Sequence, residues 1–405
     1  PRPAIESDLS VIGLVGPMAD AQNGIPLNDA ITFNSDDTTT LAALGTSNLI
    51  VDAIDGINDQ LGELQRAARI VLVRTVASSS QEANTKLAEE TAGIVGSATE
   101  KTGLHALRQA GQKLGVISRL IAAPGFTAHQ HAANEANPVA AELPAVLDDM
   151  LAMAVLGAPA TSLQAFTDWR ETLHSDRLIP IASTVKVQQP DGTTQERPPE
   201  GRVLGIAVRR DFEKNGKPFH SWANQPVQGI VGPNRSIDFS LTDGATEGQE
   251  ILAANGGIIL RGQTGIETAI ASGGFVYVGT DTLAEDDLWR FYNVKRGRDY
   301  IHLMFLRTLR YYLGRFNLTG HTIEAILQTM EFALRDLKAD NHILGYKVGF
   351  AKDQNSPEQL RLGKFTVRFA AEEPPVLRRL VLQSARYRSA LDALLDNLLT
   401  QLELA

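Results

Sequence analysis

The sequence has 405 residues, of which 43% are hydrophobic and 21% charged, with a formal net charge of −9 and no cysteine. Such a chain can bury a large core in two or three domains, and it cannot form disulfides, thiolate metal sites or cysteine nucleophiles. The acidic balance argues against bulk nucleic-acid binding, and without a long apolar run or a leader sequence we expect no membrane insertion and a cytosolic place of synthesis.

The first half of the sequence alternates predicted strands and helices, which is the rhythm of an α/β fold. Strands are expected at residues 8–15, 70–76, 116–123 and 177–182, and helices at residues 48–61, 81–95 and 138–156. The turn-rich stretch from Val185 to Gly201 predicts a surface hairpin or loop, and Gly232-Pro233-Asn234 predicts a further turn. Residues 1–60 contain nine acids and one base. This acidic front is either a solvated surface or one partner in head-to-tail self-association.

A long amphipathic helix is expected from Leu288 to Phe316, with its start marked by a capping box of Thr282 and Glu285. At about 100° per residue, one core-facing stripe contains Phe291, Val294, Ile301, Phe305, Leu309, Tyr312 and Phe316. The segment holds seven basic residues and one acid, and a separate arc of the helix contains Lys295, Arg296, Arg307 and Arg310. These four bases either meet an acidic partner or pair with acids of the same subunit or of a neighbour's acidic front.

A second helix is predicted after a break at residues 317–320, because apolar residues recur at helical spacing from Ile323 to Leu337. The period then changes to two, which predicts half-buried strands. The alternating residues are Tyr346, Val348 and Phe350, followed by Phe365, Val367 and Phe369. Beyond Pro374-Pro375, an apolar and Arg-rich arm from Val376 to Tyr387 has no later partner strand. Such an arm folds back or pairs with the sheet edge of another molecule.

Candidate chemistry is sparse. His129 and His131 lack a third ligand at a recognised spacing, and the Gly-rich segments lack the pattern of a phosphate loop. His220-Ser221 beside Asp211 has no nucleophile elbow, and Asp148 and Asp149 point about 100° apart on a helix. We therefore predict no catalytic residue, no metal site and no bound cofactor.

In order along the chain, several segments resemble the contractile-tail sheath proteins of myophages and phage-like bacteriocins. The similar segments are residues 11–16, 25–28, 70–74, 222–230, 252–260 and 273–282, then Leu360-Arg361-Leu362-Gly363-Lys364, the following strand, Pro374-Pro375 and the apolar arm. In the segment at 273–282, Val278 stands where the family has Trp and Asp281 where it has Arg. Family members usually begin with a further strand, whereas this sequence starts at Pro1-Arg2-Pro3. Either residues 1–20 are a shortened arm, or a further strand precedes them.

The resemblance implies a mixed α+β and α/β fold. An outer α/β region would span residues 21–282, possibly with an inserted subdomain at about 83–200. An inner domain of two helices and a small sheet would span 283–375, followed by a C-terminal arm at 376–405. The implied function is a structural subunit that polymerises helically around a tail tube and contracts to drive the tube through a cell envelope.

The resemblance also implies that strands exchanged between subunits complete the small sheet. The residues implied in exchange are Tyr346, Val348, Phe350, Phe365, Val367 and Phe369 of the receiving sheet and Leu380 and Leu382 of the donated arm. Lys295, Arg296, Arg307 and Arg310 would face the tube. The implied partners are other copies of the chain, the tail tube protein, and baseplate and tail terminator proteins, in a virion tail assembled in the host cytoplasm. The alternative is a cytosolic α/β enzyme with an unrecognised active site.

Overall fold

A six-stranded sheet forms the centre of the protein in the computed structural model, which describes residues 3–22, 24–46, 48–132, 134–189 and 191–403. Its strand order is β2-β3-β1-β4-β5-β6, and all neighbours are parallel except β2 and β3. The strands are β1 (Ile12–Pro17), β2 (Ala30–Asn34), β3 (Arg69–Thr75), β4 (Leu120–Ala122), β5 (Met153–Gly157) and β6 (Leu178–Ile181). Helices on both faces bury these strands, which explains their nearly continuous apolar sequences.

The two faces of the sheet have separate cores. On one face, Ile12 and Leu14 of β1 pack with α2 and α7, and on the other Val11 and Val15 pack with α3, α5 and η2. The helices are α1 (Thr38–Leu44), α2 (Leu49–Leu61), α3 (Ala83–Val95), α4 (Ala110–Leu114), α5 (Pro138–Met150), α6 (Leu163–Arg170) and α7 (Glu200–Glu213), with 3₁₀ turns η1 (Gly62–Leu64) and η2 (Gly103–Gln109). A Cβ at Gly201 would lie 2.4 Å from the Ala53 carbonyl oxygen, so this glycine permits the close packing of α7 on α2.

Several predicted boundaries in this region are wrong. Residues 138–156 are not one helix, because Leu151 adopts a left-handed conformation with φ 46° after α5 and the buried strand β5 follows. A continuous apolar run does not distinguish a buried helix from a buried strand. Residues 83–200 are not an inserted subdomain, since they supply β4, β5 and β6 to the sheet that contains β1. For the same reason the N-terminal segment ends before β1 rather than at residue 20, and Pro1 and Arg2 lie outside the described residues.

Two small sheets extend the α/β body. The first has the order β10-β7-β8 and the second β11-β12-β9. Their strands are β7 (Val185–Gln188), β8 (Thr194–Arg197), β9 (Gln225–Pro226), β10 (Gly232–Pro233), β11 (Ile258–Arg261) and β12 (Phe275–Val278), with helix α8 (Glu247–Ala253) before β11. The predicted hairpin at 185–201 is therefore confirmed. The predicted turn at Gly232-Pro233 is instead a short strand paired with β7.

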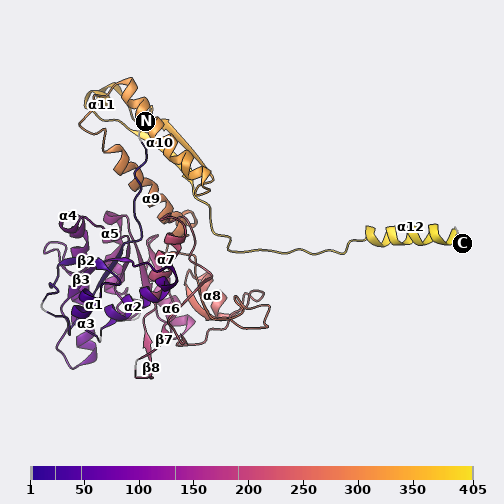
Figure 1. The fold of residues 1–405 in the computed structure, drawn as a ribbon, viewed down its shortest axis with the longest axis horizontal. Coiled ribbons are helices and arrows are strands. Elements are labelled where there is room, and N and C mark those ends of the chain that lie inside the picture. The colour runs from indigo at the N-terminus through magenta and orange to yellow at the C-terminus, as the bar shows by residue number, and fades with distance from the viewer. Residues whose placement is uncertain (1–2, 23, 47, 133, 190, 404–405) are drawn as a thin grey trace.

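A second unit of helices and a hairpin stands on the α/β body (Figure 1). It contains α9 (Tyr292–Leu309), α10 (Gly320–Ala339), β13 (Gly345–Phe350), α11 (Pro357–Arg361) and β14 (Val367–Glu372). Its core includes Tyr300, Ile301 and Phe305 of α9 and Met330 and Leu334 of α10. We call this the helical unit. It corresponds to the domain expected at 283–375.

The long helix is shorter than predicted. It begins at Tyr292, after the 3₁₀ turn η3 (Asp287–Trp289), and ends at Leu309. Thr282 does not cap it, because its buried hydroxyl donates to the carbonyl oxygens of Trp289 and Arg290, 3.3 and 3.1 Å away. The capping-box pattern therefore marks a turn and not a helix start.

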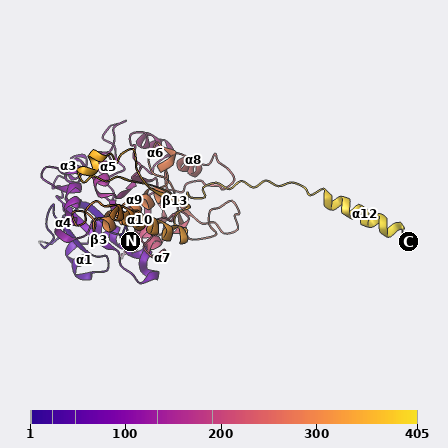
Figure 2. The same cartoon turned by 90° about the horizontal axis from the view of Figure 1, so that it is seen from above.

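Beyond Pro375 the chain leaves the body as an extended arm that ends in α12 (Ser389–Glu403) (Figures 1 and 2). Both views show α12 far from the rest of the subunit. Within the described residues no helix is long and apolar enough to cross a membrane.

Candidate assembly surfaces

Helix α9 joins the helical unit to the α/β body through buried charged groups. The Arg296 guanidinium donates to both carboxylate oxygens of Asp211, at 3.0 and 2.6 Å, and to the Leu9 carbonyl oxygen at 3.2 Å. Both side chains of the ion pair are 2% exposed, so their charges are almost completely removed from water. One contact therefore ties α9 to α7 and to the segment that precedes β1.

A second ion pair crosses this joint, and a third ties α9 to the end of β14 within the helical unit. Arg177, next to β6, donates to both oxygens of Asp299 at 2.6 and 3.3 Å, and Arg298 donates to both oxygens of Glu373 at 2.8 Å. Burial alone would lower the pKa of Arg177, but its hydrogen bonds to Asp299 and Asp148 outweigh that effect and raise the pKa. The two-pronged Arg177–Asp299 contact thus helps to fix the orientation of α9 on the sheet.

An aromatic pair packs within the same joint. The rings of Tyr292 and Trp222 stack with centroids 4.3 Å apart. The Tyr292 hydroxyl accepts from the Trp222 amide at 2.9 Å and donates to the Gly279 carbonyl oxygen at 3.0 Å. Burial raises the pKa of Tyr292 to about 12, so the hydroxyl stays protonated and keeps its donor role.

The four basic residues expected on one outward face do not share a surface. Arg296 is buried against Asp211, and Lys295 pairs with Asp176 beside β6. Arg307 and Arg310 are exposed at the far end of α9, where Arg307 also donates to the Glu6 carbonyl oxygen. The expectation of one tube-facing set fails for Lys295 and Arg296, because acids distant in the sequence neutralise them within the subunit. A helical wheel contains no information on such tertiary partners.

The sheet of the helical unit contains two antiparallel strands, with Val348 opposite Phe369. One face packs on the helices through Tyr346, Val348, Val367 and Phe369. Phe350 is 42% exposed, and its ring lies 5.9 Å from that of Phe365, which precedes β14 and is not part of it. In the described structure each strand has one neighbour, so each retains an unpaired edge.

The arm contacts its own subunit near its root. Arg378 donates to Asp281 and to the Leu252 carbonyl oxygen, each at 2.7 Å, and Arg290 also pairs with Asp281. Asp281 stands where the resembling family has Arg, and here it holds two arginines. Further along, Leu380 and Leu382 are 72% and 86% exposed. Pattern alone did not show this anchor, although the charge change at 281 is a signal that could have suggested it.

The residues considered for catalysis do not assemble into a site. Asp211 is engaged by Arg296, while the Ser221 hydroxyl lies 3.1 Å from that of Tyr292. His220 packs against His342, and burial lowers its pKa to about 4. The Thr91 hydroxyl lies 3.3 Å from His129. Among the described residues no group of three His, Cys, Asp or Glu side chains is arranged to hold a metal ion.

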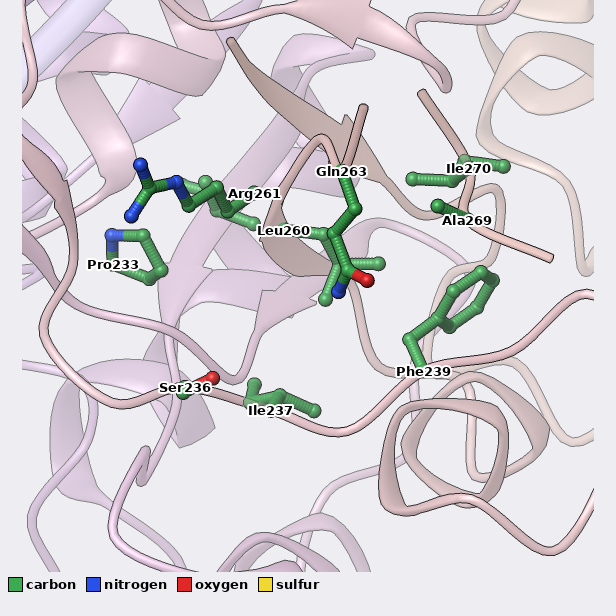
Figure 3. A pocket seen from close by; sticks show the side chains of 10 residues that line it. Pro233, Ser236, Ile237, Phe239, Leu260, Arg261, Gln263, Ala269 and Ile270 are labelled. Atoms are coloured by element: carbon green, nitrogen blue, oxygen red, sulfur yellow. The ribbon is translucent and has the colours of Figure 1, made fainter. Parts of the chain in front are cut away.

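Two cavities are candidates for ligand sites. The one in Figure 3, lined by Pro233, Ile237, Phe239 and Leu260, has a volume of about 40 Å³, which suits water and not a cofactor. The other, of about 350 Å³, lies at the carboxyl ends of β1 and β4, where α/β folds bind ligands. The start of α2 beside it is already capped, since the Asn48 side chain accepts from the Val51 amide at 2.9 Å and is itself held by Asp20 at 3.1 Å.

Comparison with known proteins agrees with this architecture. No family model matches the chain. A putative prophage major tail sheath protein of Pseudomonas aeruginosa (strain UCBPP-PA14) is 27% identical over 374 residues, covering 90% of this chain and 88% of the relative. The tail sheath protein of Escherichia phage P2 is 22% identical over 398 residues, covering 96% and 92%. Over nearly its full length the chain is similar to contractile-tail sheath proteins, as the sequence predicted.

A solved structure shows the same fold at full length. It is the sheath complex of an extracellular contractile injection system, PVC, in its contracted state. Its TM-score is 0.68 at 14% identity, with 96% of this chain and 94% of that chain covered. The mixed α/β architecture predicted for a sheath protein is therefore confirmed. These relatives are named as tail sheath proteins, which supports the prediction of a structural protein rather than an enzyme.

Proposed function

We propose that copies of this sheath subunit polymerise helically around a tail tube and hold together by exchanging their C-terminal arms. The donated segment lies within residues 376–387, and the receiving sheet is β13 with β14. The polymer would contract as one body and drive the tube through the envelope of a target cell. This is the action that the tail sheath relatives suggest for the chain.

Two features of the same molecule support arm exchange. They are a two-stranded sheet with unpaired edges and an extended arm that leaves the subunit. Both β13 and β14 have an open edge, and the arm exposes Leu380 and Leu382 to solvent. Strand addition pairs the backbone groups of such edges. Several hydrogen bonds along an extended arm resist pulling while the root of the arm bends. Such a link would persist through a large rearrangement of the subunits.

Removal of everything after Pro375 tests this exchange. The truncated protein keeps the three described cores and all strands, so it should retain the circular dichroism spectrum of the α/β body and elute as a folded monomer. It should form no sheath, because the donated strand is missing. A truncated protein that still builds sheaths able to contract without breaking would show that the arm is not the link.

We further propose that Arg307 and Arg310 at the end of α9 face the tube. Both are exposed, unlike Lys295 and Arg296, and the helical unit would then be the inner layer of the sheath. Single exposed pairs contribute only roughly 0.2–1 kcal/mol. Repetition over many subunits would make the total large and leave each contact easy to break. We also propose that baseplate and terminator proteins bind the two ends of the sheath, and that the sheath assembles in a host cytoplasm.

A further inference from the structure

Helix α12 is an amphipathic element that packs on no other described part of its own subunit (Figures 1 and 2). Its leucines recur at spacings of three and four and lie on one face. They are Leu391, Leu394, Leu395, Leu398, Leu399 and Leu402, and they are between 45% and 73% exposed. An isolated helix of 15 residues is marginal in water. This stripe therefore needs a surface to cover it.

A complementary surface lies at one end of the β13–β14 sheet. Around α11, Phe350 and Leu362 are 42% and 69% exposed. Beside them Lys352, Arg361 and Lys364 are exposed and make no ion pair within the described residues. We call these five residues the α11 patch. The patch is apolar and its charge is basic on balance, since of the nearby exposed acids Asp353 is paired with Arg368 and Glu358 is outnumbered by the three bases. Helix α12, in contrast, carries the exposed acids Asp392 and Asp396.

The opposite end of the sheet has a different charge. There Leu344 is 61% exposed, but its exposed charged neighbours are Asp340 and Glu372 besides Lys338. The acids of α12 would meet like charges at this end, which is unfavourable. Charge complementarity thus selects the α11 patch over the Leu344 end.

We infer that α12 of one copy docks on the α11 patch of a second copy, next to the strand that the same arm donates. This inference rests on the proposed arm exchange and extends it. It also fixes the direction of the donated strand, which must run from the end of the sheet at Gly345 and Glu372 toward the end at Phe350 and Val367. The arm then runs antiparallel to β14 or parallel to β13.

The geometry of the chain allows this placement. Residues 376–388, fully extended, reach roughly 40 Å, so α12 can extend beyond its own body onto a neighbour. Arg378, bound to Asp281, holds the root of the arm on the outside of its own α/β body. The strand and the helix would be one continuous attachment. The helix adds apolar area at the end of the strand, where backbone pairing alone would fray.

Cysteine crosslinking tests the inference cleanly, because the protein has no cysteine. Full-length protein with Leu395→Cys and Leu362→Cys should form dimers and a ladder of higher oligomers on a non-reducing gel after mild oxidation. The matched control, Leu395→Cys with Leu344→Cys, places the second thiol on the other end of the sheet and should remain monomeric. Each single substitution gives the background.

Three results would overturn the inference. They are a ladder from the Leu344 pair, a disulfide closed within one monomer, and no disulfide from either pair in assembled protein. A disulfide from Leu395→Cys to a cysteine introduced on the tube protein, with none to Leu362→Cys, would assign α12 to the tube instead.

Charge reversal supplies a readout independent of cysteine. Arg361→Glu with Lys364→Glu should abolish the Leu395–Leu362 disulfide, and adding Asp392→Lys with Asp396→Lys should restore it. Failure of the restoration would mean that charge does not direct docking. Deletion after Arg388 separates the two proposals. If that protein polymerises and contracts normally while deletion after Pro375 does not, arm exchange stands and docking of α12 is not needed.

Discussion

Buried charge is concentrated where α9 enters the α/β body. Arg296–Asp211, Arg177–Asp299 and Arg298–Glu373 each use two donor nitrogens or two acceptor oxygens, and their acidic partners are 5% exposed or less. A buried pair is not strongly stabilising relative to apolar residues, but loss of one member leaves an unpaired charge in the interior. The Arg296–Asp211 and Arg177–Asp299 pairs therefore set the angle between the helical unit and the body, and Arg298–Glu373 holds α9 to the end of β14.

Arg296→Met should destabilise the subunit by about 3–5 kcal/mol, because Asp211 would be left charged and buried. Urea unfolding followed by circular dichroism would measure this. Arg310→Met is the matched control on the same helix, and since Arg310 is exposed the change should stay within about 0.5 kcal/mol. Equal effects of the two substitutions would show that the Arg296–Asp211 pair does not maintain the joint.

Glu200 predicts a pH dependence of stability. It is fully buried at the start of α7 and accepts from the Gly125 amide at 3.0 Å, and burial raises its pKa to about 7. A carboxyl group whose pKa is higher in the folded protein than in the unfolded chain favours folding at low pH. Its contribution is lost as the pH rises from the unfolded value near 4.5 to about 7.

Glu200→Gln tests this because it keeps the shape of the side chain and removes the titration. Relative to the wild type, the variant should gain stability between pH 5 and pH 8, by about 3 kcal/mol at most. Thermal unfolding across this range measures the difference. A difference in melting temperature that does not change with pH would mean that Glu200 stays charged in the folded subunit.

At the scale of elements, the sequence predicts best where local signals agree with burial. Helix α2 begins after Asn48, whose side chain accepts from the Val51 amide at 2.9 Å, and it ends at Leu61 as the periodicity predicted. The sequence also predicted the extent of α10 and the hairpin of β7 and β8. The prediction failed at residues 151–156, where an apolar run fits both a helix and a buried strand. Helix α7 was not predicted, although its apolar residues recur at helical spacing.

The candidate surfaces could be predicted only in part. Alternation in the sequence located the receiving strands, although Phe365 precedes β14 and Phe350 is exposed at the sheet end. The sequence could not show which of the four basic residues of α9 form ion pairs within the subunit, because the acids that bind Lys295 and Arg296 come from residues 176 and 211. Partners so distant along the chain are set by the tertiary fold and not by local pattern.

The exposed end of α9 carries a prediction at this scale. Reversing charge with Arg307→Glu and Arg310→Glu should still permit polymers of the sheath alone but reduce assembly around tubes. The difference from the wild type should be largest at low salt, because salt screens exposed charges. Lys295→Glu, on the buried half of the same helix, is the contrasting variant and should instead lower folding stability. Electron microscopy of tails would count tube-filled sheaths. Normal numbers of filled tails from the double variant would assign the basic residues to another partner.

In the whole molecule, ion pairs join the helical unit to the α/β body, and the C-terminal arm extends away from both. Two buried ion pairs, Arg296–Asp211 and Arg177–Asp299, hold the helical unit on the α/β body, while the arm leaves through an extended stretch anchored by Arg378. Under the proposed function, subunits would move as nearly rigid bodies and the arms would bend between them. The acidic front, with nine acids in residues 1–60, would face neighbours in such a lattice.

Negative-stain electron microscopy of the purified full-length protein tests the central claim most directly. A sheath subunit that exchanges arms should form hollow helical cylinders of stacked rings, and the protein truncated after Pro375 should not. Discrete small oligomers of the full-length protein, under conditions in which it is folded and concentrated, would contradict the account.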